Sequence, residues 1–271
     1  MKKKFTIISI LFVTFYTSTI NAQDRHFAWT YESTTLPKGA IDIEPWVTFS
    51  TGGKNFYRSY ENRIEFETGL TDRLQTSVYL NTGQKSEALT NADGEIIGLE
   101  ESSSFSFSNE WQLNILNPSV SPVGLGLYAE YGLSTDEIEL EFKLLLDKKT
   151  PRSIFSYNFV TELEFENEFE QEDGEGKIET EKEFIIENDL AYMYMIKPTL
   201  GIGLEARNHN EFVKGEMEHA AIFFGPTLFF SQNRFFAIVN ALPQLTDLKR
   251  NGLELNEHQK FSGRILLGFS F

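Results

Sequence analysis

The chain has 271 residues, with 24 Lys and Arg against 40 Asp and Glu, a formal net charge of −16 at pH 7, and no Cys. So acidic a chain is a poor partner for nucleic acid or anionic lipid, and the absence of Cys excludes a disulfide framework and a lipidated cysteine. Its 25 Phe, ten Tyr and three Trp indicate a large apolar surface, although the mean hydropathy is only −0.28. Strands in which apolar and polar positions alternate are consistent with both facts. The hydropathies of neighbouring residues average out along such a strand, although one of its faces is wholly apolar.

The first 22 residues have the pattern of a signal peptide. Three lysines follow Met1, an apolar stretch runs from Phe5 to Tyr16, and the small residue Ala22 precedes Gln23. This stretch is too short for a membrane-spanning helix, which needs roughly 20 apolar residues. We expect cleavage after residue 22, which removes three lysines and no acids and leaves a formal charge near −19.

Residues 23–39 precede the regular pattern. The stretch from Phe27 to Glu32 alternates, and the sequence Leu36-Pro37-Lys38-Gly39 that follows is a turn signal. The sequence leaves three readings open for this segment, namely an extra strand, a periplasmic arm and a plug of the lumen. We place it outside the barrel proper.

From Ala40 onward, apolar and polar residues alternate with a period of two, which is typical of strands with two different faces. The predicted strands are 41–49, 60–70, 74–81, 104–115, 125–133, 137–146, 155–169, 184–195, 200–207, 220–231, 235–242 and 261–271. Polar segments without a period predict loops at 82–102, 170–181, 208–219 and 247–257. Short connections follow the even-numbered strands, as in outer-membrane barrels with short periplasmic turns. Residues 40–271 are therefore predicted to be all-β, a transmembrane antiparallel up-and-down β-barrel of about twelve strands.

The last predicted strand carries a further signal. Five apolar residues share one of its faces: Phe261, Ile265, Leu267, Phe269 and Phe271. The strand resembles the closing strand of bacterial outer-membrane barrels, which typically ends in a Phe that the barrel assembly machinery reads. This resemblance implies two partners, outer-membrane lipid and the assembly machinery, the latter through Phe271.

Other segments resemble a family of uncharacterised, Bacteroidota-like outer-membrane β-barrels. These segments are residues 27–46, 69–75, 203–208, 225–228 and 242–245. More loosely, they are similar to porin-like proteins linked to the meta-cleavage pathway of phenol degradation, which are taken to be transporters. The resemblance implies a barrel in the outer membrane of a Gram-negative bacterium, and it carries over no functional residue because its motifs are turn and strand-end signatures.

Acidic residues dominate the strand face that is predicted to line the lumen. The charged candidates on this face are Glu44, Arg63, Glu65, Glu67, Glu110, Glu130, Glu139, Glu141, Lys143, Glu162, Glu164, Glu166, Glu187, Asp189, Glu205, Arg207, Lys260 and Arg264. One reading is a pore that attracts cations, because charge of one sign in a channel concentrates counter-ions. The other is a water-filled interior that tolerates any polar residue, with some acids paired to Arg.

We expect a channel or transporter for small hydrophilic, cationic solutes, with no cofactor. The alternative is a structural or surface-binding barrel without an open pore. An outer-membrane hydrolase is less favoured, because the four His residues are predicted to lie at strand ends or in loops and no Gly-x-Ser-x-Gly elbow occurs. We therefore expect no enzyme and assign no catalytic residue.

Two kinds of predicted loop carry residues that could bind a metal. His209 and His219 flank the predicted loop at 208–219, which also contains Glu211, Glu216 and Glu218, and together they could clamp a divalent metal if the loop folds back. Their spacing matches no compact metal motif, so a solvated loop is favoured. The acidic segments 91–95 and 172–175 resemble fragments of calcium loops without the full ligand series. No metal ligand is assigned from the sequence.

Overall fold

The computed structural model describes residues 25–271 except 92, 173–174, 251 and 257, and it describes only the backbone of residues 168–172 and 175–176. The expected signal peptide lies outside these residues. Within them the chain forms twelve strands, namely β1 (Ile41–Thr51), β2 (Tyr57–Thr71), β3 (Leu74–Thr90), β4 (Ile96–Leu116), β5 (Gly124–Leu133), β6 (Glu137–Lys149), β7 (Ser153–Glu172), β8 (Glu175–Lys197), β9 (Leu200–Val213), β10 (Glu216–Gln232), β11 (Phe235–Asp247) and β12 (Phe261–Ser270).

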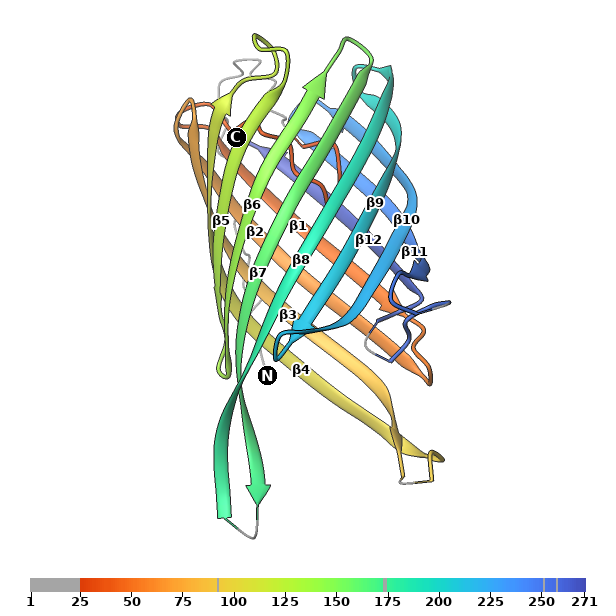
Figure 1. Cartoon of the computed structure of the whole chain (residues 1–271). Coiled ribbons are helices and arrows are strands. Elements are labelled where there is room, and N and C mark those ends of the chain that lie inside the picture. The colour runs from red at the N-terminus through yellow and green to blue at the C-terminus, as the bar shows by residue number, and fades with distance from the viewer. Residues whose placement is uncertain (1–24, 92, 173–174, 251, 257) are drawn as a thin grey trace, which may run out of the picture.

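Each strand pairs antiparallel with its neighbours in sequence, and β1 pairs with β12, so the sheet closes into a barrel (Figure 1). The β1–β12 seam runs from Asp42 opposite Ser270 to Thr51 opposite Phe261. Closure pairs every strand edge, as hydrocarbon requires, because it offers backbone groups no water. The predicted fold, a transmembrane antiparallel up-and-down barrel of about twelve strands, is confirmed. The described residues contain no helix that is long and apolar enough to span a membrane.

The two faces of each strand meet different surroundings. In β12, Ile265 is 52% exposed while the adjacent Leu266 is fully buried. Large apolar side chains elsewhere point outward in the same way, for example Phe142 on β6 and Phe155 on β7. The inward positions are mostly buried and polar or charged. This alternation gives the barrel an apolar outer surface suited to lipid.

Three predicted long loops are in fact hairpins of extended strands. The segments 82–102, 170–181 and 208–219 mostly continue β3 into β4, β7 into β8 and β9 into β10. The β3–β4 and β7–β8 hairpins reach far beyond the barrel at the end opposite the carboxyl terminus (Figure 1). Beyond the membrane both faces of a strand meet water, so the period-two signal disappears although the backbone pairing continues. The prediction of loops was therefore wrong for these segments.

The β10–β11 pairing is irregular beside Gly225. The register shifts between Ile222 and Phe223, and the pairing is interrupted between the pairs Phe223–Gln244 and Thr227–Asn240. Pro226 and Pro243 lie in this interval and cannot donate to the ladder. A Cβ atom on Gly225 would lie 1.8 Å from the carbonyl oxygen of Ala241, which is backbone and cannot swing aside. Only glycine fits this position without a shift of one strand.

We expect Gly225→Ala to impair folding of the barrel, because the added methyl group forces β10 away from β11. Overpacking of this kind costs about 1–3 kcal/mol. The measurement is refolding into detergent micelles, followed by the heat-dependent change in gel migration of a folded barrel. Gly98→Ala on β4 is the control, because a Cβ atom there meets nothing within 4 Å. Equal refolding of the two variants would contradict the prediction.

Candidate functional site

Residues 25–36 lie inside the barrel and are called the inner segment below. The coil is visible within the ring of strands in Figure 1, in red and orange. Phe27 and Ala28 are fully buried, and Leu36 is 3% exposed. A turn closed by the hydrogen bond from Ala40 N to the carbonyl oxygen of Pro37 (3.0 Å) then leads into β1. The sequence left three interpretations of this segment open. The geometry corresponds to the one in which the segment lies in the lumen.

The inner segment is held by side chains that point inward from the strands. The Glu205 carboxylate on β9 accepts hydrogen bonds from the backbone N–H groups of Ala28 (3.1 Å), Trp29 (2.8 Å) and Thr30 (3.1 Å). Three more N–H groups donate to inward side chains, Tyr31 to Asn158 (2.6 Å), Ser33 to Asp147 (2.9 Å) and Leu36 to Gln75 (2.7 Å). A buried irregular backbone needs such partners because it has no ladder of its own.

Small residues on β5 make room for the inner segment. A Cβ atom on Gly126 would lie 3.2 Å from the Cα and 3.3 Å from the Cβ of Ser33. At Gly124 it would lie 2.3 Å from the Ser33 hydroxyl. The carbonyl oxygen of Ser33 also accepts a hydrogen bond from Asn114 Nδ2 (2.6 Å). Ser33 is therefore clamped between neighbouring strands of the barrel.

Two arginines of the barrel stack on Trp29 of the inner segment. The guanidinium carbons of Arg264 and Arg207 lie 3.5 Å and 3.8 Å from the ring centroid of Trp29. Arg264 also donates from Nη1 to the carbonyl oxygen of Ala28 (2.8 Å). Each cation–π contact of a desolvated Arg contributes about 2 kcal/mol. Two of the predicted lumen bases thus bind the protein's own chain.

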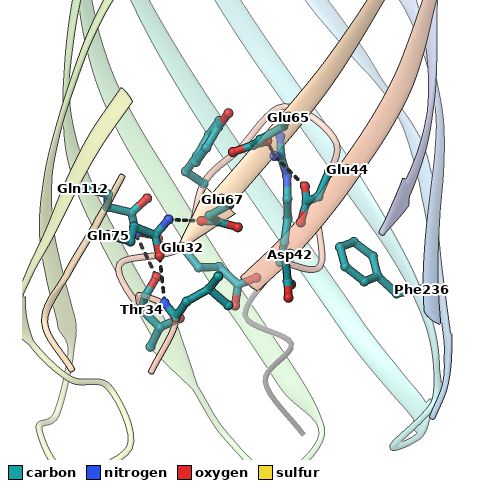
Figure 2. Close-up of a pocket in the computed structure, with 12 residues that line it drawn as sticks. Glu32, Thr34, Asp42, Glu44, Glu65, Glu67, Gln75, Gln112 and Phe236 are labelled. Carbon is teal, nitrogen blue, oxygen red and sulfur yellow. Dashed lines mark hydrogen bonds and ion pairs between the residues drawn. The ribbon is translucent and has the colours of Figure 1, made fainter. Parts of the chain in front are cut away.

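At its amino-terminal end, the inner segment places the positively charged side chain of Arg25 among the acids of the lumen. Arg25 Nη1 lies 3.3 Å from Glu44 Oε2 and 3.6 Å from Glu65 Oε2. These acids line a small cavity of about 40 Å³. Figure 2 shows Asp42, Glu44, Glu65 and Glu67 converging there from β1 and β2, beside Glu32 and Thr34 of the inner segment. Part of the predicted lumen acid is therefore matched by Arg25.

Glu32 anchors the middle of the inner segment as a buried anion. Lys149 Nζ and His26 Nδ1 each lie 2.9 Å from a Glu32 carboxylate oxygen. Burial by itself raises the pKa of Glu32, but Lys149 and His26 outweigh it and lower the pKa to about 2. Because the folded-state pKa is depressed, this contribution to stability is present in full above pH ~4.5 and is lost as the pH falls through about 2.

A large cavity of about 490 Å³ opens at the end of the barrel from which the long hairpins emerge. Trp29 and Tyr31 of the inner segment form part of its lining. Among the described residues its lining includes nine acids, which are Glu61, Glu130, Glu137, Glu139, Glu141, Glu162, Glu164, Glu187 and Asp189. Four permanent bases, Arg63, Lys143, Arg207 and Arg264, line it as well. Acids therefore outnumber bases about two to one at its surface.

Three of these bases are paired locally. Arg63 Nη1 lies 3.4 Å from Glu130, and Lys143 Nζ lies 3.0 Å from Glu141. Arg207 forms an ion pair with Glu187 and lies 3.8 Å from Asp189. These ion pairs agree with the interpretation in which basic residues neutralise acids of the lumen. Several glutamates on one side of the cavity take no part in them.

On that side, glutamates face one another across strands. β6 and β7 pair Glu137 with Glu166, Glu139 with Glu164, and Glu141 with Glu162. The first row continues to Glu181 and the second to Glu183 on β8. Like charges directly opposite each other are destabilising. In the part of the chain that the structure describes, no base lies within 4.0 Å of Glu139, Glu162 or Glu164.

The predicted lumen residues fall into separate groups. Glu44, Glu65 and Glu67 line the small cavity, and Glu205 holds the inner segment. Glu110 is fully buried and accepts a hydrogen bond from the Tyr79 hydroxyl. Glu166 and Lys260 are exposed. The remaining candidates line the large cavity, namely Arg63, Glu130, Glu139, Glu141, Lys143, Glu162, Glu164, Glu187, Asp189, Arg207 and Arg264.

Three histidines also converge at this end of the barrel. His209 on β9, His219 on β10 and His258 from the β11–β12 connection place one ring nitrogen each within 4.8 Å of the others. Sequence reasoning placed the first two on a solvated loop and did not connect the third. Burial, reinforced by the charges of His209 and His219, lowers the pKa of His258 to about 2. This ring is therefore neutral at physiological pH.

Sequence reasoning missed the residues of the inner segment. Arg25, Trp29 and Tyr31 line or fill the lumen, yet they lie ahead of the first predicted strand. The only pattern in the sequence that marked these residues was the alternation from Phe27 to Glu32. An extra strand or a periplasmic arm would show the same alternation. Which barrel residues they meet depends on contacts such as Ala28 with Glu205, separated by 177 residues.

Known structures share the architecture at low sequence identity. The NanC porin is 12% identical with a TM-score of 0.52, covering 84% of this chain and 98% of that one. The translocator domain of the autotransporter NalP from Neisseria meningitidis is 11% identical with a TM-score of 0.57, covering 86% and 89%. The KdgM porin, solved in complex with disordered oligogalacturonate, is 8% identical with a TM-score of 0.51, covering 86% and 99%. At these identities the likeness is one of fold.

No curated protein matches the chain. A family model matches residues 19–271, which include the inner segment and all twelve strands. The chain therefore belongs to the family of unknown function DUF6662, whose member here is a closed barrel with the fold of outer-membrane β-barrels.

Proposed function

We propose that this protein is a gated outer-membrane channel for small hydrophilic cations. The observation that carries the proposal is the large cavity, whose lining has nine acids and four permanent bases among the described residues. A polar cavity with an excess of one charge, enclosed by a low-dielectric wall, concentrates counter-ions and repels co-ions. Cations would therefore enter from the end that bears the long hairpins.

The glutamate rows of β6 and β7 would supply the selectivity. Arg63, Lys143 and Arg207 already pair with other acids, whereas Glu139, Glu162 and Glu164 have no base within 4.0 Å among the described residues. The repulsion between facing carboxylates falls when a cation or a proton lies between them. Mobile cations in the lumen would provide that relief without a fixed partner.

The inner segment would act as the gate. It crosses the lumen from β9 past β7 and β6 to β3, held by Glu205, Asn158, Asp147 and Gln75. Its polar attachment consists of hydrogen bonds and ion pairs with side chains, which water can replace one by one. Phe27 and Ala28 add apolar contacts with the barrel wall. A change in its position would alter the free cross-section without disturbing the strand ladder.

The proposal also concerns location and assembly. The apolar outer surface fits lipid, and the fold is shared with outer-membrane porins. We infer that the protein resides in the outer membrane of a Gram-negative bacterium. Its closing strand β12 would be the element that the barrel assembly machinery engages.

We expect the triple variant Glu139→Gln, Glu162→Gln, Glu164→Gln to lose most of the cation preference. The measurement is the reversal potential of the refolded protein in a planar bilayer under a potassium chloride gradient. The cation-to-anion permeability ratio should fall on the order of several-fold, because three carboxyl groups without bases are replaced in the cavity by amides, which cannot carry a negative charge.

A matched triple variant carries the same three substitutions, Glu to Gln, outside the lumen. Glu95, Glu100 and Glu101 are exposed on the β3–β4 hairpin, so their replacement by Gln should leave the reversal potential unchanged. Anion preference of the wild-type channel would refute the cationic solute. No channel events, even from variants that release the inner segment, would favour a structural or surface-binding barrel instead.

A further inference from the structure

Two of the three histidines at the mouth of the barrel, His209 and His219, share one face of the β9–β10 hairpin. His209 and Glu211 are two residues apart on β9, so both point into the lumen. His219 on β10 lies directly opposite Glu211. The strands are joined by the two-residue turn Lys214–Gly215, in which both residues have positive φ angles of 53° and 83°. A turn of this kind fixes the register next to it. An irregularity between Met217 and His219 then shifts the pairing by one residue, which places His219 opposite Glu211.

The β11–β12 connection brings the third imidazole to this face. The His258 ring lies edge-on to His219, with 3.9 Å between ring centroids, and 5.0 Å from His209. The connection is anchored on both sides of this ring. Lys54 N donates to the carbonyl oxygen of Leu255 (2.7 Å), and Lys260 N donates to the carbonyl oxygen of Gly52. The approach of His258 to the hairpin therefore follows from the path of the backbone.

Buried ring nitrogens in this cluster lack hydrogen-bond partners. His219 is fully buried, and its Nδ1 has no partner among the described atoms. The buried Nε2 of His258 is likewise unpartnered within the described residues. A buried polar atom without a partner costs about 1–3 kcal/mol. Three imidazoles gathered in this way point to a ligand that accepts their lone pairs.

The carboxylates around the cluster are arranged as metal ligands require. Glu211 Oε2 lies 3.2 Å from His219 Nε2 and 3.9 Å from His209 Nε2. On its other side, His209 Nδ1 lies 2.9 Å from Glu187 Oε2. A carboxylate bound to one ring nitrogen places the proton there and leaves the opposite nitrogen free for a metal. Glu187 would thus orient His209 so that its Nε2 faces Glu211 and His219.

We propose that His209, His219 and His258, with Glu211 as a fourth ligand, bind a divalent transition-metal ion of the Zn²⁺ type. Three imidazoles and one carboxylate are a tetrahedral donor set for this ion. Ligand nitrogens around Zn²⁺ lie about 3.4 Å apart, so the rings, now within 4.8 Å, need to approach by about 1.4 Å at most. His209 also lines the large cavity, which gives the ion a path of entry.

The bound ion would fasten the β11–β12 connection to the β9–β10 hairpin. Its ligands come from two strands and from the connection, and it would add to contacts such as the hydrogen bond from Lys249 Nζ to the carbonyl oxygen of Glu218 (3.1 Å). Because the connection lies at the mouth of the lumen, occupancy of this site would stabilise the connection over the channel entrance. The site is distinct from the glutamate rows, which offer only the hard oxygen ligands that calcium and magnesium prefer.

Titration of the refolded protein in detergent with Zn²⁺ tests the proposal, with Ca²⁺ in excess to occupy lumen carboxylates. We expect one tight site in the wild type. His219→Ala or His258→Ala should weaken it by more than the about 10–100-fold that loss of an outer-shell partner costs. Glu187→Gln should fall within that range. His26→Gln is the control, because His26 lies in the inner segment and contacts Glu32.

A second readout follows the connection itself. Trypsin can cleave after the exposed Lys249 and Arg250, and Zn²⁺ should slow this cleavage in the wild type but not in His258→Ala. The heat-dependent gel shift shows that each variant is folded before its binding is measured. Zinc binding that Ca²⁺ abolishes, or that is equal in the wild type and the His258→Ala variant, would overturn the proposal. These measurements do not depend on conduction.

Discussion

The double variant Ser33→Cys, Gly126→Cys is expected to shut the channel when oxidised and to restore wild-type conductance when reduced. A Cβ atom on Gly126 would lie 3.3 Å from the Ser33 Cβ, close to the about 3.5–4.5 Å that separates the Cβ atoms of a disulfide. The sequence has no other Cys, so the bond can form only at this position within one chain. It would fix the inner segment to β5 in the observed position.

The measurement is single-channel recording of one sample before and after a reducing agent is added. Ser33→Cys alone and Gly126→Cys alone are the controls, and neither should respond to reduction. If the oxidised double variant conducts like the wild type, the inner segment is not the gate and ions pass beside it. Stable closure under both conditions would instead indicate that the substitutions themselves block the lumen.

Glu205→Ala is expected to have the opposite effect and to favour the open channel. Its carboxylate accepts hydrogen bonds from the N–H groups of Ala28, Trp29 and Thr30, and from Asn240 Nδ2 (3.2 Å). In Glu205→Ala, the buried donors have no acceptor while the inner segment stays in the observed position. Once the inner segment moves, water accepts their hydrogen bonds. One unsatisfied donor costs about 1–3 kcal/mol, and 1.4 kcal/mol changes an equilibrium tenfold. We therefore expect the open fraction to rise about tenfold or more.

Open probability in the planar bilayer measures this effect. Glu205→Gln keeps one oxygen acceptor and should fall between the wild type and Glu205→Ala. Glu100→Ala, on the exposed part of β4, removes the same charge and should change nothing. If Glu205→Ala opens no more often than the wild type, then Glu205 stabilises the barrel without controlling the inner segment.

The difference between the predicted loops and the observed hairpins shows what alternation reports. Alternation marks the part of a strand that separates lipid from lumen, so it ends where the membrane ends, while the β3–β4 and β7–β8 ladders continue. The spacing of His209 and Glu211 on one strand face was present in the sequence, but it has meaning only once the segment is known to be a strand. With 208–219 predicted as a loop, the sequence could offer His209, His219 and Glu211 only as a clamp that requires the loop to fold back, and it did not connect them with His258.

The sequence by itself determined the barrel: the period of two assigns each residue to lipid or lumen, and twelve such segments with short turns after the even ones close the sheet. These features depend on residues that are near one another in the chain. The tertiary structure decided what occupies the lumen. Glu205 meets Ala28 and His258 meets His219 only after the ring has closed, because inward side chains of distant strands are brought together by closure and by no local pattern. For that reason the acids could be counted from the sequence, while their division among the inner segment, the arginines and the open cavity could not.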